Sequence, residues 1–163
     1  MFRPYPPSPE DLAELETVAE GYRAAMARRE WQRAGQLLTD KGLAQHIAII
    51  LFGSFYEVDS GKIDRDSFMA LLERHGLPTN TRSEWLFHPG LPLAFAELIE
   101  WLGAQWTDYD ILAQLSDPFA DARFEDFRML ESGQASATLV HGDGRRQNAR
   151  FEKTDQGWRM TEY

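Results

Sequence analysis

Alternation of apolar and polar residues dominates the C-terminal quarter of the chain. In one of its segments Ala135, Ala137 and Leu139 share one face, and the residues between them share the other. Glycine-containing turns at residues 142–144 and 154–157 separate this segment from two later ones. The pattern predicts an antiparallel meander of four strands, at residues 124–131, 134–141, 145–153 and 158–163. Because side chains alternate between the two faces of a sheet, one face is apolar and other elements must cover it.

Helical periodicity marks most of the preceding chain. After Ser8-Pro9, apolar residues recur at three- and four-residue spacing, with Ser8 suited to the N-cap and Pro9 to the first helical position. The prolines before them predict an extended lead-in at residues 1–8. A short helix is expected from Trp31 to about residues 40–42, and another at residues 67–75, capped by Asp64 or Asp66. A loop should follow at residues 78–92. Pro92 should then open a last helix, which breaks near residues 107–108 and ends at residues 116–118.

These elements predict one domain, residues 1–163, of the α+β class. We expect N-terminal helices packed on a curved C-terminal antiparallel sheet, in a cone-like arrangement, since the apolar sheet face must meet the apolar helix stripes. The residues expected to be buried together are Leu15, Leu98, Leu102, Leu139, Phe151 and Trp158.

The segment 43–58 is apolar almost without interruption. Such a run is typical of an element buried on all sides, and periodicity alone does not separate a helix from a strand. We expect a buried helix in its first half and an extended or turning second half, followed by a turn at residues 59–61.

Composition limits the classes of function. The net charge is −9, and because residues 123–163 hold seven basic and seven acidic residues, the whole excess lies in residues 1–122. Neither part has the basic patch that binding to nucleic acid needs. There is no cysteine, no apolar segment of the length of a membrane span and no apolar region of a secretory signal at the start. The expectation is a cytoplasmic protein without a cofactor, with no nucleic acid or membrane as partner.

Candidate metal and acid–base groups are sparse. Residues 58–68 resemble the second half of a calcium-binding loop. With Gly61 as the turn glycine, however, the first, third and twelfth ligand positions fall on Tyr56, Val58 and Ser67, which offer no carboxylate. The four histidines lack the spacing of a helical metal site. His46, with apolar neighbours, is expected to be a hydrogen-bonded core residue rather than a catalytic one. Asp126 is expected to point inward if Phe124 and Phe127 straddle the sheet edge, which makes it a weak candidate for a base.

Several of these segments resemble a known family. The strand with Ala135, Ala137 and Leu139, the strand with Phe151 and the closing Gly157-Trp158-Arg159-Met160 resemble the C-terminal sheet of nuclear-transport-factor-like, or SnoaL-like, proteins. The first helix, ending in Arg28-Arg29-Glu30-Trp31, and the turn at residues 59–68 are similar to that family as well. The helical block from Trp85 to Leu115 is longer than in the family. The resemblance implies a cone with an apolar cavity, in proteins that include isomerases, dehydratases, hydrolases and many members without catalysis.

Two functions follow as hypotheses. The first is a non-catalytic module that binds a small apolar ligand or another protein, because no convergent acid–base set is visible. The alternative is a small-molecule isomerase or hydrolase, with His46 or Asp126 as base and Tyr22 or Tyr56 as hydrogen-bond donor in an apolar pocket. The predicted ligand-binding residues are Tyr22, His46, Tyr56, Trp106 and Asp126.

A homodimer through the outer sheet face is also expected, since tyrosine and arginine are enriched where interfaces carry most of their energy. The residues assigned to that face are Arg146, Asn148, Arg150, Arg159 and Thr161, with Val140 and Tyr163 as its apolar members.

Overall fold

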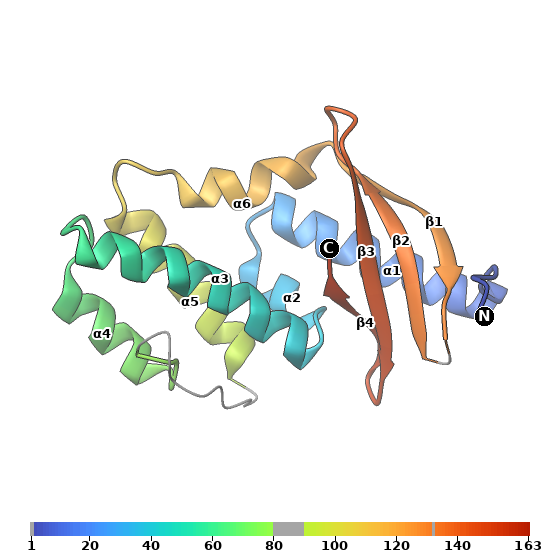
Figure 1. Cartoon of the computed structure of the whole chain (residues 1–163), viewed down its shortest axis with the longest axis horizontal. Helices are drawn as coiled ribbons and strands as arrows, with labels where there is room; N and C mark the ends of the chain where they lie inside the picture. The colour runs from blue at the N-terminus through green and yellow to red at the C-terminus, as the bar shows by residue number, and fades with distance from the viewer. Residues whose placement is uncertain (1, 80–89, 132) are drawn as a thin grey trace.

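The computed structural model describes residues 2–79, 90–131 and 133–163, and these form an α+β fold, as predicted (Figure 1). The described helices precede a four-stranded antiparallel sheet in the order β1-β2-β3-β4. Most of the loop predicted at residues 78–92 lies outside the described residues. The elements are α1 (Pro9–Ala27), α2 (Trp31–Gln36), α3 (Asp40–Asp59), α4 (Arg65–Arg74), α5 (Leu91–Gln105), α6 (Ile111–Ala120), β1 (Arg123–Met129), β2 (Gln134–Val140), β3 (Arg146–Thr154) and β4 (Gly157–Glu162).

The inner face of the sheet packs against α1. Helix α1 begins as predicted, with Ser8 as N-cap accepting a hydrogen bond from the Asp11 amide at 3.1 Å. Two further hydrogen bonds of 3.0 Å join its first turns to β4: the Trp158 amide donates to the Glu14 carboxylate, and Trp158 Nε1 donates to Asp11. The bond from Trp158 is the main cause that lowers the pKa of Asp11.

Both edges of the sheet are partly covered by chain from the N-terminal half. Tyr5, in the predicted lead-in, exchanges two backbone hydrogen bonds with Met129 of β1. On the other edge, Leu38 forms a parallel bridge to Met160 of β4, with the Met160 amide donating to the Leu37 carbonyl at 3.0 Å. These pairings protect strand edges that would otherwise be open to another chain.

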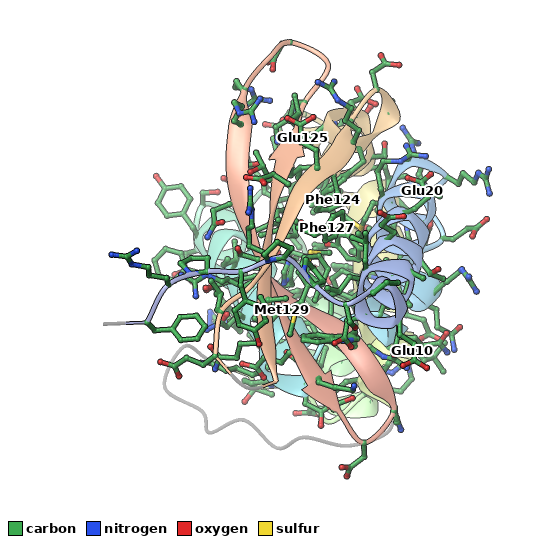
Figure 2. The ribbon with its side chains drawn as sticks, turned by 90° about the vertical axis from the view of Figure 1, so that its right-hand side faces the viewer. Glu10, Glu20, Phe124, Glu125, Phe127 and Met129 are labelled. Carbon is green, nitrogen blue, oxygen red and sulfur yellow. The ribbon has the colours of Figure 1, made fainter. Side chains whose placement is uncertain are left out.

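A bulge in β1 determines which side chains reach the core. The pairing with β2 gains one extra β1 residue between Glu125 and Arg128, and Asp126 has a φ of 55°. A strand without the bulge would place Phe124 and Phe127 on opposite faces. Here both rings contact Phe151, at centroid distances of 6.2 and 6.1 Å, on the side of β1 that faces α1 (Figure 2). The prediction that Asp126 points inward is wrong, because the bulge leaves it exposed and paired with Arg128 at 2.9 Å.

Helix α3 corrects two predictions. It continues to Asp59, so the second half of the segment 43–58 is neither extended nor turning. One face is buried against the core through Leu43, Ile47, Leu51, Ser54 and Val58, and the opposite face is exposed. The run is therefore not buried on all sides. Apolar residues on both faces hide the helical period, which is why the pattern did not reveal the element.

The remaining differences concern helix ends. Residues 40–42 begin α3 rather than end α2, because Thr39 is an N-cap whose hydroxyl accepts from the Gly42 amide at 3.0 Å. Asp64 caps α4, and Pro92 follows Leu91 inside α5 instead of opening it. The predicted break after α5 is present, but α6 continues through Pro118 to Ala120. A proline in a last turn removes few helical hydrogen bonds, and the extra residues bring Phe119 into the core.

The predicted core is confirmed. Each of the six residues named for it is completely buried and belongs to one continuous cluster in which α1, α5 and the sheet meet: Leu15, Leu98, Leu102, Leu139, Phe151 and Trp158.

Replacement of Trp158 by alanine should lower the free energy of unfolding by about 3–5 kcal/mol, through the cavity it leaves and the loss of the bond to Asp11. Equilibrium denaturation measures the change. The control is Glu16→Ala, at an exposed position of α1, which should cost less than about 0.5 kcal/mol. A loss below about 1 kcal/mol for Trp158→Ala would contradict the packing of α1 on the sheet.

The bulge gives a second prediction. Asp126 holds a left-handed backbone, which aspartate and asparagine tolerate and β-branched residues do not. Asp126→Val should therefore lower the free energy of unfolding by about 1–2 kcal/mol more than Asp126→Asn, which removes the same charge. Equal effects of the two variants in denaturation experiments would show that the bulge is absent.

Candidate functional site

Two of the predicted site residues come together around a third residue. Tyr22 of α1 donates a hydrogen bond from its hydroxyl to the Tyr163 hydroxyl at 3.0 Å. The His46 ring of α3 lies against Tyr163 with 5.1 Å between centroids, and Phe119 of α6 packs edge-on against both tyrosines. We call Tyr22, His46 and Tyr163 the polar cluster. It joins α1, α3 and the end of β4.

A close approach of backbones positions His46. A Cβ atom on Gly42 would lie 2.6 Å from the Thr161 carbonyl oxygen, so only glycine lets the first turn of α3 rest on β4. One turn later, His46 Nδ1 lies 2.7 Å from the Gly42 carbonyl oxygen. Since a carbonyl only accepts, Nδ1 carries the proton and Nε2 holds the lone pair of the neutral ring.

Burial keeps the polar cluster uncharged near neutral pH. It raises the pKa of Tyr22 well above its usual value, with smaller contributions from Tyr163, and it raises the pKa of Tyr163. For His46, burial lowers the pKa and outweighs the hydrogen bond to Gly42. Such groups can donate or accept hydrogen bonds. The two phenols cannot act as bases near neutral pH, because their hydroxyls stay protonated.

The other predicted site residues lie elsewhere. Tyr56 is on the outer face of α3, with 72% of its surface exposed. Trp106 follows α5 and packs on Tyr109 at 4.6 Å between centroids. Asp126 is in the exposed bulge of β1. The five residues therefore do not form one site.

Four hollows bounded by described residues are lined by none of the five. One hollow of about 340 Å³ lies between α6 and the β2–β3 turn and is lined partly by Asp117, Asp121, His141 and Arg145. His141 there is tied to the Pro118 carbonyl at 2.9 Å and to the Gln147 side chain, so both ring nitrogens are engaged. Tyr22 is completely buried, and no substrate could reach its hydroxyl without displacement of the core.

Sequence reasoning missed Tyr163 and His141. Alternation assigned Tyr163 and Val140 to the outer sheet face, but neither is an exposed residue there: Val140 is 4% exposed, although it lies outside the core cluster, and Tyr163 packs on Tyr22 and His46. The alternation rule fails for Tyr163 because β4 ends at Glu162. For His141, the only signal was its place directly after an alternating strand.

Within the described ranges, no group of three or more histidine and carboxylate residues could hold a metal ion. None of the helices in those ranges combines the length and the apolar character that crossing a membrane requires. Comparison of the chain with protein-family models, with curated proteins and with solved structures found no match.

The lowered pKa of His46 predicts a pH-dependent stability. Because the folded protein disfavours the imidazolium, the unfolded chain binds more protons once the pH falls through about 6.5. The free energy of unfolding should therefore decrease when the pH is lowered from about 7.5 to about 5.5. For the His46→Asn variant, the free energy of unfolding should decrease less over the same range. Asparagine can keep the hydrogen bond to Gly42 without titrating. Denaturation at both pH values tests this, and identical pH dependence in the two proteins would contradict the burial of His46.

Proposed function

We propose that this protein is a non-catalytic protein-interaction module that binds its partner through the exposed face of α3. The observation that supports the proposal is a row of three large apolar side chains on that face. Ile49, Phe52 and Tyr56 are 74%, 71% and 72% exposed. We call these three residues the outer α3 stripe.

The outer α3 stripe differs from scattered surface apolar residues. Its members follow each other at spacings of three and four, so they are neighbours on one helix face. Together they offer roughly 400 Å² of apolar surface, which is in the range of functional patches. The adjacent Gly53 has open space where a side chain would be, so a partner can approach the helix backbone closely there. This arrangement fits recognition of another helix or a groove.

The interior supports an interaction module better than an enzyme. Trp158, Tyr22, Phe68, Phe95 and Phe151 are fully buried and fill the space that a ligand would need. The polar cluster has a hydrogen-bonded pair, but it lines none of the four hollows described above. A small apolar ligand and an isomerase or hydrolase activity thus have less support than binding of a protein.

Membership of the nuclear-transport-factor-like proteins belongs to the same proposal. Its support is the order of the elements: a long first helix, further helices and a C-terminal antiparallel meander. Members without catalysis are part of that fold's range, so the two proposals are compatible.

Site-specific photocrosslinking tests the interaction. A photoreactive phenylalanine derivative at position 52, in the protein expressed in its own host, should give a defined covalent adduct with another polypeptide. The matched control carries the derivative in place of Glu16, which is exposed on α1, and should give none. Tyr56→Glu in the same chain should remove the adduct from position 52. Absence of an adduct at position 52, or equal adducts at both positions, would refute the proposal.

A further inference from the structure

We infer that the partner of the outer α3 stripe is a second copy of this chain, bound with the two α3 helices antiparallel across a two-fold axis between Ile49 and Phe52. This inference rests on the proposed function and gives it a partner. The observations that carry it are the order of side chains along the helix face, the charges at its two ends and the character of the outer sheet face.

The residues on the exposed face of α3 can pair with the same residues of an antiparallel second copy. Its exposed positions run from a base, through an amide and the outer α3 stripe, to an acid: Lys41, Gln45, Ile49, Phe52, Tyr56 and Asp59. When a second helix runs in the opposite direction, Ile49 faces Phe52 of the other copy and Gln45 faces Tyr56. The same register places Lys41 beside Asp59. A two-fold axis repeats each pairing, as an isologous interface requires.

The helix dipole disfavours both end charges, although Lys41 lines a hollow with Glu152 and Glu162 of the sheet. Lys41 lies in the first turn of α3 and Asp59 is its last residue, so each charge is at the end of the helix dipole that disfavours it. Neither forms an ion pair with another described residue. An antiparallel second copy pairs each with an opposite charge, whereas a parallel copy would bring like charges together.

The outer α3 stripe is large enough to form the apolar centre of a dimer interface. The outer α3 stripe supplies roughly 400 Å² of apolar surface per copy, against about 800 Å² per partner in a standard interface with an apolar centre and a polar rim. Lys41, Gln45 and Asp59 can form part of that rim. A helix of 20 residues is about 30 Å long, which accommodates all of these pairings.

Two other arrangements have less support. The outer sheet face has exposed Arg146, Asn148 and Arg150. Of the apolar residues assigned to it, Val140 is only 4% exposed and Tyr163 packs on Tyr22. The dimer predicted through the sheet thus lacks an apolar centre. A lipid surface is disfavoured because the chain carries a net charge of −9 and the exposed α3 face has one basic residue at one end and one acidic residue at the other.

Light scattering of the purified protein over a concentration series tests the second copy. We expect a mass that rises to twice 18.7 kDa. Phe52→Glu should raise the dimer dissociation constant by about thirty-fold or more, because it puts a carboxylate at the centre of the interface. The matched control is Asn148→Glu, which adds the same charge to the outer sheet face and should leave the dimer intact. Circular dichroism checks that both variants are folded.

A charge exchange tests the antiparallel register. Lys41→Glu and Asp59→Lys should each raise the dissociation constant by about three- to ten-fold, since each places like charges opposite one another. The double variant should return close to the original value. Lys41→Glu puts a negative charge in the first turn of α3 and Asp59→Lys puts a positive charge in its last turn, and the helix dipole favours both. Weaker association of these variants would therefore not result from loss of the helix. A double variant as weak as the single ones would overturn this register.

The outcomes separate the inference from the function on which it rests. The inference that a second copy binds to α3 fails if the protein is a monomer at every concentration. It also fails if the protein forms a dimer that Asn148→Glu breaks and Phe52→Glu does not. If position 52 nevertheless crosslinks in cells to a different protein, the interaction module stands with another partner. If position 52 crosslinks to nothing and the protein is monomeric, both proposals fail.

Discussion

Coverage of one apolar sheet face is the constraint on which the rest of this structure depends. Strands β2 and β3 turn Ala135, Ala137, Ala149 and Phe151 to the same side, and all four are buried. Helix α1 packs against that side and against α2 and α6, so it connects the sheet to the other helices. The bonds from Trp158 to Asp11 and Glu14 fix the start of the helix. The C-terminal strands and the N-terminal helix are thus stable only together.

The same constraint explains which parts of the fold the sequence predicted. Alternation in β2 and β3 is regular and their turns contain glycine, so their limits were predicted within one or two residues. In β1 the alternation changes phase at Asp126, and a sequence does not show whether such a change is a bulge or an end. The result of missing the bulge was a wrong direction for Asp126 and a wrong relation between Phe124 and Phe127.

Prediction of the site had a different limit. His46 was chosen because a polar group among apolar neighbours needs a partner, and that argument correctly indicates that its ring is engaged. It does not indicate whether the partner is a ligand or the protein itself. Here Tyr163 supplies the partner of Tyr22, and its position depends on how the chain leaves β4. Tyr22 and Tyr56 were both chosen as possible hydrogen-bond donors, but Tyr56 lies beside Ile49 and Phe52, which are apolar residues of the surface rather than of the core.

Helix α3 shows why an apolar segment does not imply complete burial. A helix that is apolar all round is stable in water only if both of its faces are covered. The core covers one face of α3 through Ile47, Leu51 and Val58, whereas Ile49, Phe52 and Tyr56 remain exposed on the other. Their exposure contributes nothing to the stability of the single chain, and so packing of the monomer does not account for these residue types. A contact that covers the second face would account for them, and it would also account for the positions of Lys41 and Asp59 at opposite ends of the same helix.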